Sequence, residues 1–158
     1  MENLDRNFWL ESPQQRLHKW KIFRRSLVDV PSKMEKISDV WNIWFFSPDV
    51  KITMDPYDTT KWPTVWELLQ QGETCKYSKS LGAAYTMYYL NNSLDIDIMR
   101  VYDKTNNDIY IAGKIEDKLL MPYSLDVMNF QEECNNISIE ETWSVAAVLD
   151  SILHRATK

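Results

Sequence analysis

The spacing of the apolar residues changes near Leu94, and this change constrains the fold more than any other feature of the chain. Before Leu94, apolar side chains recur three and four residues apart, as they do on one face of a helix. After it, Leu94, Ile96 and Ile98 alternate with aspartates, as they do on a strand with one buried face. We therefore expect helices followed by an antiparallel sheet, which is the α+β fold class.

The N-terminal part carries two helix starts. Ser12 and Ser32 each precede a segment with helical apolar spacing, and serine is a favoured N-cap residue because its hydroxyl accepts a backbone N–H. The pattern predicts a helical hairpin over residues 12–46. Residues 1–11 show no clear period, and we expect them to form an N-terminal arm outside the hairpin.

The remaining segments follow from turn and capping residues. Short connections between the strands indicate a three-stranded antiparallel meander. A serine followed three residues later by glutamate, at 138–141, indicates the start of a C-terminal helix over residues 138–156. In chain order we expect a short helix at 63–71, a helix at 75–90, strands near 94–103, 109–115 and 118–123, and the C-terminal helix.

Length and composition bound the class of protein. The 158 residues are 44% hydrophobic and 26% charged, as in a soluble globular protein, and we expect a single domain over residues 1–158. No apolar stretch approaches the roughly 20 residues of a spanning helix, so we expect no membrane span and no membrane partner. The net charge of −5 argues against general nucleic-acid binding, whose affinity comes mainly from cations that neutralise phosphates.

The cysteines and histidines are few. Cys75 and Cys134 cannot build a disulfide framework, and the chain starts without a signal-type segment, so we expect a reducing, cytoplasmic location. No CxxC or HxxxH spacing occurs, and Asp95 and Asp97 fit the solvated face of a strand. We therefore predict neither a metal site nor a cofactor.

Cys75 is the main candidate for chemistry. It heads the helix predicted at 75–90, where unpaired backbone N–H groups and the helix dipole favour the thiolate, the nucleophilic form. The alternative is that Cys75 is simply a small buried apolar residue, as free cysteine often is.

A cysteine-headed helix followed directly by an antiparallel meander resembles the papain-like cysteine hydrolases and, more narrowly, the transglutaminase-like core, over residues 62–126. The resemblance implies that Cys75 is the nucleophile, that Asp126 is the orienting acid, and that a histidine lies at the start of the second strand. Asn107, Asp108 and Tyr110 occupy that region instead. The resemblance therefore implies a fold that was kept while catalysis was lost.

The histidines of the chain are His18 and His154, and both fall in the predicted terminal helices. If Cys75 is active after all, as a transglutaminase-type or amidase-type acyltransferase, one of these two must be its base and Asp126 must orient it.

A basic, aromatic region near the N-terminus is the candidate binding surface. The cations interleave with Trp20 and Phe23, a pattern that fits a solvated helix face, a protein-binding surface, or a grip on single-stranded nucleic acid. Three apolar residues on the arm add to it. The candidate partner-binding residues are Phe8, Trp9, Leu10, Arg16, Lys19, Arg24 and Arg25.

The segment from Trp62 to Leu69, continuing through Cys75 to residues 83–86, also resembles short uncharacterised proteins of tailed bacteriophages. Together the two resemblances predict a non-enzymatic structural or assembly protein in a homo- or hetero-oligomeric complex with protein partners, located in the host cytoplasm or the virion. The alternatives are the Cys75 enzyme and single-stranded nucleic-acid binding.

Overall fold

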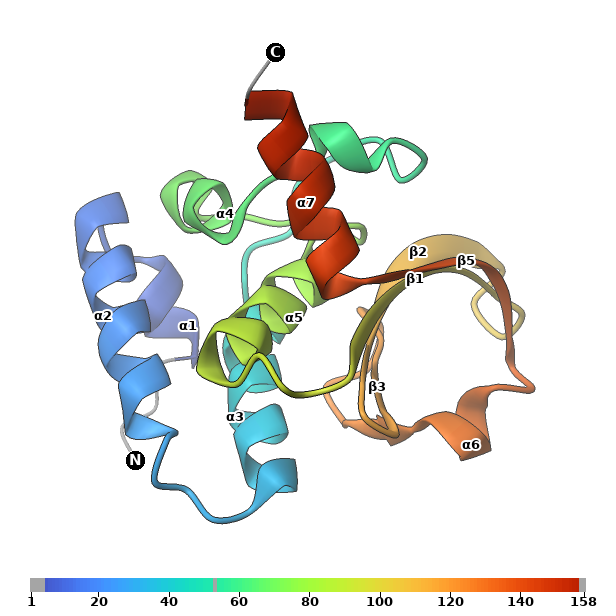
Figure 1. Cartoon of the computed structure of the whole chain (residues 1–158), viewed down its shortest axis with the longest axis horizontal. Helices are drawn as coiled ribbons and strands as arrows, with labels where there is room; N and C mark the ends of the chain where they lie inside the picture. The colour runs from blue at the N-terminus through green and yellow to red at the C-terminus, as the bar shows by residue number, and fades with distance from the viewer. Residues whose placement is uncertain (1–4, 53, 157–158) are drawn as a thin grey trace.

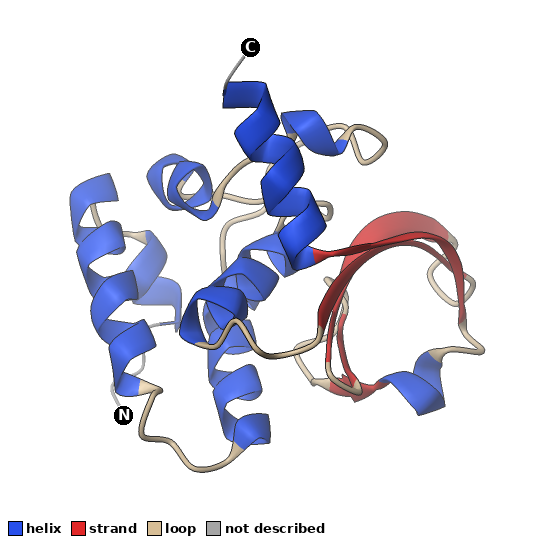
Figure 2. Cartoon of the chain, in the orientation of Figure 1, coloured by secondary structure: helices blue, strands red, loops and turns tan. Residues whose placement is uncertain are grey.

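The computed structural model describes residues 5–52 and 54–156, and these form the predicted α+β fold (Figures 1 and 2). The elements in chain order are α1 (Asp5–Trp9), α2 (Pro13–Ser26), α3 (Lys33–Phe45), the 3-10 helix η1 (Thr59–Lys61), α4 (Val65–Gln71), α5 (Lys79–Leu90), β1 (Ile96–Asp103), β2 (Asp108–Ile115), β3 (Lys118–Leu120), β4 (Met128–Asn129), α6 (Phe130–Glu133), β5 (Ile137–Ser144) and α7 (Val145–Ala156).

The predicted meander is the centre of a larger antiparallel sheet. The described strands pair in the order β4-β3-β2-β1-β5, so the meander β1-β2-β3 gains a strand at each edge. The sheet is strongly curled (Figure 1). Ile98 and Ile111 pack in the main core with α5, whereas Met99, Tyr110 and Leu119 form a second apolar cluster on the other face of the sheet.

The helical hairpin is present as α2 and α3, and both serines act as predicted. Ser12 Oγ accepts the backbone N–H of Gln15 at 3.2 Å, and Ser32 Oγ accepts that of Glu35 at 3.1 Å. Beside α3 lies α5, which is buried over most of its length and contacts β2 as well as α3. A helix covered on several sides in this way is the central support of the fold (Figure 1).

The predicted C-terminal helix over 138–156 begins too early. Residues 137–144 form β5, and the helix α7 starts at Val145, where Ser144 Oγ accepts the Ala147 N–H at 3.1 Å. The reason is pairing with β1: Arg100 on β1 reaches the carboxylates of Glu140 at 2.9 Å and Glu141 at 3.5 Å. This non-local pairing overrides the local capping signal at Ser138.

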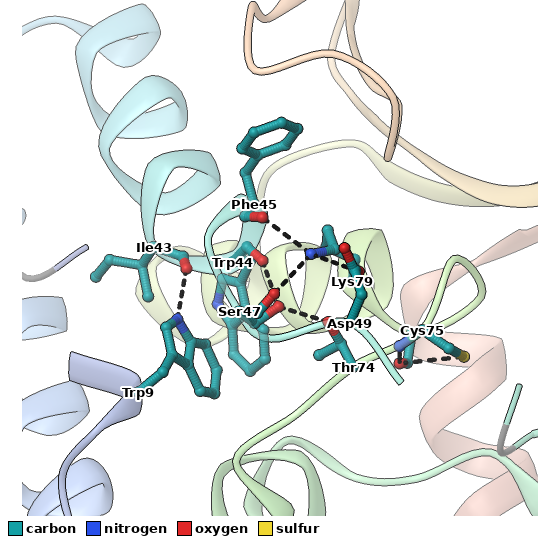
Figure 3. Close-up of polar contacts among 10 residues, drawn as sticks. Trp9, Ile43, Trp44, Phe45, Ser47, Asp49, Thr74, Cys75 and Lys79 are labelled. Carbon is teal, nitrogen blue, oxygen red and sulfur yellow. Dashed lines mark hydrogen bonds and ion pairs between the residues drawn. The ribbon is translucent and has the colours of Figure 1, made fainter. Parts of the chain in front are cut away.

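The N-terminal arm is not an exposed arm over its described part. Residues 5–9 form α1, and the side chains of Phe8 and Trp9 are buried in the main core. The Trp9 indole N–H donates to the Ile43 carbonyl at 2.8 Å (Figure 3), and its ring packs edge-on against Trp44. Large aromatic rings gain more from burial than from exposure, so here only Leu10, 83% exposed, offers the apolar surface that the sequence suggested.

None of the helices in residues 5–52 and 54–156 combines the length and the apolar character that a bilayer crossing requires.

Candidate functional site

Cys75 lies just before α5 rather than inside it. Thr74 is held extended against the chain after α3, because its N–H donates to the Pro48 carbonyl and its own carbonyl accepts the Val50 N–H, both at 2.9 Å. The helix therefore begins at Lys79, whose N–H donates to the Cys75 carbonyl at 3.1 Å. Cys75 thus lies in the turn that leads into the N-terminal end of α5.

The thiol is buried and hydrogen-bonded. Cys75 is 1% exposed, and Ser78 Oγ donates to its sulfur at 3.6 Å while accepting its backbone N–H at 2.9 Å (Figure 3). Ser78 therefore fixes both the backbone and the thiol of Cys75 in one orientation.

An open pocket of about 680 Å³ lies over Cys75. Three segments of chain build it: the loop after α3, the turn before α5, and the turn after β3. Its lining residues are Asp49, Val50, Lys51, Ile52, Cys75, Lys76, Pro122 and Tyr123. The pocket is of the size that holds a small ligand or a side chain of a larger one.

Asp108, the first residue of β2, stands at the strand start where the transglutaminase resemblance expects a histidine. Its Oδ1 pairs with Lys76 Nζ at 2.7 Å, and its Oδ2 accepts the Tyr123 hydroxyl. The Lys76 backbone is also tied to β2, because its carbonyl accepts the Ile111 N–H at 3.4 Å. The three side chains of Lys76, Asp108 and Tyr123 form a hydrogen-bonded cluster, two of whose members share the pocket with Cys75.

This cluster shifts the pKa values of its members. Burial acts to raise the pKa of Asp108, but the hydrogen bonds from Lys76 and Tyr123 outweigh it, so the pKa lies below the ordinary carboxyl value. In turn, the hydrogen bond to Asp108 raises the pKa of Tyr123 to about 12, so Tyr123 keeps its proton at neutral pH. The carboxylate is thus held ionised between two donors.

Lys79 holds the loop that borders the pocket. Its ammonium donates to the carbonyls of Phe45 and Ser47, each at 2.9 Å, and pairs with Asp49 Oδ1 at 3.1 Å (Figure 3). Burial lowers the pKa of Lys79, and the hydrogen bond from Lys79 to Asp49 opposes this shift. Because all three of its N–H donors are used, Lys79 acts as a support for residues 45–49.

The structure brings Cys75 together with none of the other predicted catalytic residues that it describes. Asp126 is exposed in the segment beyond Tyr123 and does not line the pocket, and His18 is exposed on α2, also outside the lining. The side chain of His154 lies outside the described residues. The cluster around Asp108 was missed because Lys76 and Tyr123 reach it only through the folded chain.

Arg16, predicted to be part of an exposed binding surface, is instead a buried structural residue. Its guanidinium donates to the Leu69 carbonyl at 2.6 Å and to the Gln70 carbonyl at 2.9 Å, and it also donates to the Glu11 carbonyl. Leu69 and Gln70 are near the C-terminal end of α4, where carbonyls lack helical partners, so the cation satisfies them.

Other members of the basic region also interact within the chain. Lys19 pairs with Glu11 at 2.6 Å, and Arg24 stacks on the Trp20 ring at 4.5 Å from its centroid, whereas Arg25 is exposed. The protein partners and the oligomeric assembly stay predictions.

Over the part of the chain that the structure describes, no group of three Asp, Glu, His or Cys side chains could hold an ion.

Comparison with known proteins shows the fold. No family model matches the chain, and no curated protein matches it by sequence. Solved structures of LapG from Legionella pneumophila do match. The calcium-bound form superposes with a TM-score of 0.71 at 10% sequence identity, covering 92% of each chain. A second LapG structure gives 0.67 at 11% identity, covering 90% of this chain and 88% of LapG.

These matches show a transglutaminase-like core, which confirms that resemblance. They lend no support to a tailed-phage origin. LapG is a cysteine protease, so the structural neighbours are enzymes, and the prediction of a non-enzymatic structural or assembly protein with lost catalysis is contradicted. The cysteine-nucleophile alternative fits these neighbours better.

Proposed function

We propose that this protein is a cysteine-dependent acyl-transfer enzyme, of the transglutaminase or amidase type, that uses Cys75 as its nucleophile. The observation that carries the proposal is the position of the Cys75 thiol: it stands at the N-terminal end of α5, below an open pocket, in a fold similar to that of a cysteine protease. A position at a helix N-terminus is one of the features that activate cysteine nucleophiles.

The reaction has two steps. The Cys75 sulfur adds to the carbonyl carbon of an amide, the carbon–nitrogen bond breaks, and the nitrogen leaves as an amine with the proton that the thiol gave up. Water or a second amine then adds to the thioester carbon, and the carbon–sulfur bond breaks to return the thiol. The products are a carboxylic acid or a new amide.

Selective alkylation tests this proposal, since Cys134 provides a control within the same chain. Cys134 is half-buried and its thiol donates to the Gln131 carbonyl at 3.4 Å. With iodoacetamide, followed by peptide mass spectrometry, we expect Cys75 to react about tenfold faster than Cys134 near neutral pH, because Cys75 lines the open pocket and Cys134 does not. Equal, slow labelling of both cysteines would overturn the proposal.

Acylation provides the second measurement. p-Nitrophenyl acetate should acetylate Cys75 in the wild-type protein, and hydroxylamine should remove the acetyl group because it is a thioester. C75A should give no acetylated protein, whereas C134A should behave as wild type. Acetylation that persists in C75A would assign the reaction to another residue.

A further inference from the structure

We propose that Lys76, held in place by Asp108, is the acid–base group of the Cys75 site and does the work of the imidazole in histidine-dependent cysteine hydrolases. This inference rests on the proposed function. It assigns Lys76 as a catalytic residue and Asp108 as a positioning residue.

Geometry is the first argument. Lys76 follows Cys75 directly in sequence, lines the same pocket, and has its backbone fixed to β2. Its ammonium is held at 2.7 Å from Asp108 Oδ1, so it is directed toward the start of β2 instead of extending into solvent. The start of β2 is where the transglutaminase-like resemblance places the histidine, and Asp108 occupies it here.

Elimination among the described bases is the second argument. His18 is outside the pocket, and Lys79 has all three donors engaged with Asp49 and two carbonyls. Tyr123 keeps its proton to about pH 12 and cannot accept another near neutrality. Lys51 lines the pocket but its side chain is exposed. Lys76 is therefore the amine best placed to serve Cys75.

The ordinary acidities of a thiol and an amine allow proton transfer from Cys75 to Lys76. A thiol has an ordinary pKa near 8.5 and a lysine ammonium near 10.4, so a neighbouring thiol and amine favour thiolate and ammonium by about two units. In the proposed cycle the Lys76 ammonium takes the place of the imidazolium as the proton donor. An ammonium is also well matched to protonate an amine leaving group, whose basicity is close to its own.

Protons balance through the cycle. The Lys76 amine takes the Cys75 thiol proton, and the thiolate then adds to the amide carbon. The carbon–nitrogen bond breaks as the Lys76 ammonium gives its proton to the departing nitrogen. The neutral amine next takes a proton from water as that water adds to the thioester, and the carbon–sulfur bond breaks to restore thiolate and ammonium.

Asp108 is held by three hydrogen bonds, donated by Lys76, by Tyr123 and by the backbone N–H of Ile109 at 2.9 Å. Tyr123 donates to Oδ2, and Oδ1 accepts both Lys76 and the Ile109 N–H. Each segment packed around this site contributes titratable or charged groups. The loop after α3 contributes Asp49 and Lys51, and the turn into α5 contributes Lys76, Tyr77 and Lys79. The other two groups are Asp108 from β2 and Tyr123 from the turn after β3. Lys79 also interacts electrostatically with Cys75, but its three donors are engaged with Asp49 and two carbonyls, so we expect Lys76 to be the lysine that exchanges a proton with Cys75.

The pH dependence of iodoacetamide labelling tests the inference without a known substrate. In K76M we expect the midpoint for Cys75 alkylation to move upward by about one pH unit or more, because the thiolate loses its cation. K76R keeps the positive charge and should retain the wild-type midpoint. K33M is the matched control, since Lys33 also forms a salt bridge, with Glu116 at 2.9 Å, but lies outside the pocket, and it should not move the midpoint.

Deacetylation separates charge from proton transfer. p-Nitrophenolate leaves without needing a proton, so K76R should still be acetylated on Cys75. Arginine does not release its proton in proteins, so hydrolysis of that acetyl-enzyme should slow by about 100-fold in K76R. D108N should slow hydrolysis by a smaller factor and should shift the pH profile, which a purely structural ion pair would not do.

The two proposals fail in different ways. If Cys75 labels no faster than Cys134 in the wild-type protein, the proposed function itself fails. If Cys75 labels selectively but K76R hydrolyses its acetyl-enzyme at the wild-type rate, the Lys76 inference is overturned and Lys76–Asp108 is a structural ion pair. A thermal unfolding scan of each variant identifies any that fail to fold, and K76R, which keeps the charge, decides the matter if K76M does not fold.

Discussion

Gly82 on α5 lies so close to Trp44 on α3 that a methyl group on its Cα would come within 2.3 Å of Trp44 Cε3. The indole face therefore occupies the space of a side chain, and the two helices cross at the smallest residue available. Because Cys75 lies directly before α5, this crossing also fixes where Cys75 stands relative to the loop after α3.

G82A should lower the free energy of unfolding by about 2–4 kcal/mol. Alanine favours a helix over glycine by roughly 0.5–1 kcal/mol, but the overlap with a rigid, buried indole costs more than that gain. Urea unfolding measures the change. G113A is the matched control, because a methyl group there would find its nearest neighbour at 3.5 Å, an ordinary contact. An equal loss in both variants would contradict the packing argument.

Thr86 provides a second prediction in the same core. Its hydroxyl accepts the indole N–H groups of Trp20 and Trp44, each at 3.0 Å, and donates to the Gly82 carbonyl at 2.9 Å. T86V keeps the shape but leaves two buried N–H groups without their acceptor, which should cost about 2–4 kcal/mol of unfolding free energy.

T86S is the control for Thr86. It retains the hydroxyl and loses one methyl group, so we expect a loss of about 1 kcal/mol. Urea unfolding of the two variants compares the hydroxyl with the methyl directly. A T86S protein as unstable as T86V would show that the methyl group, and not the shared acceptor, stabilises this part of the core.

Local signals in the sequence predicted much of the fold. The caps at Ser12 and Ser32 act within three residues of themselves, and the two-residue alternation of the strands reflects one buried face. The segment Ser138–Glu141 matches the capping-box pattern but forms part of β5, because it pairs with β1. This partner lies some forty residues earlier in the chain. A local sequence pattern cannot predict a pairing between strands so far apart in the chain.

The candidate site likewise has one part that local sequence predicts and another that depends on contacts between distant residues. Cys75 could be found from its position before a helix, although Thr74 delays the start of that helix through contacts with residues 48–50. The cluster of Lys76, Asp108 and Tyr123 could not be predicted, because its members come from three separate segments of the chain. It also contains no histidine, the residue type that would have marked it as a catalytic candidate. Phe8 and Trp9 were predicted to form a contact surface because the sequence does not show what buries them. Trp9, for example, contacts Ile43 and Trp44 on α3, which are far from it in the chain.

A substitution of Arg16 tests whether this residue stabilises the fold or belongs to an exposed binding surface. R16M should lower the unfolding free energy by about 2–4 kcal/mol, because the carbonyls of Leu69 and Gln70 lose a charged, buried donor. K19M removes an equal charge from the half-exposed pair with Glu11 and should cost about 0.5 kcal/mol or less. Thermal unfolding of both variants checks this, and a small effect of R16M would return Arg16 to the group of surface residues.

The hydrogen bond between Tyr123 and Asp108 predicts the pH at which Tyr123 ionises. Tyr123 should titrate near pH 12, and D108N should bring its pKa down toward the ordinary value near 10, because the carboxylate no longer opposes a phenolate beside it. The tyrosinate absorbance of each protein, with that of Y123F subtracted, isolates this group from the buried Tyr110, whose pKa burial and Asp103 also raise.

The sign of the linked stability follows from these shifts. The folded-state pKa of Tyr123 is raised, so its contribution is complete below about pH 10 and is lost as the pH rises through about 12. The folded-state pKa of Asp108 is lowered, so its contribution is complete above the ordinary carboxyl pKa and is lost as the pH falls through the lowered value. Y123F should therefore lose stability relative to wild type at neutral pH, and the difference should shrink in strong alkali. A difference that does not depend on pH would mean that the hydrogen bond to Asp108 does not set the ionisation of Tyr123.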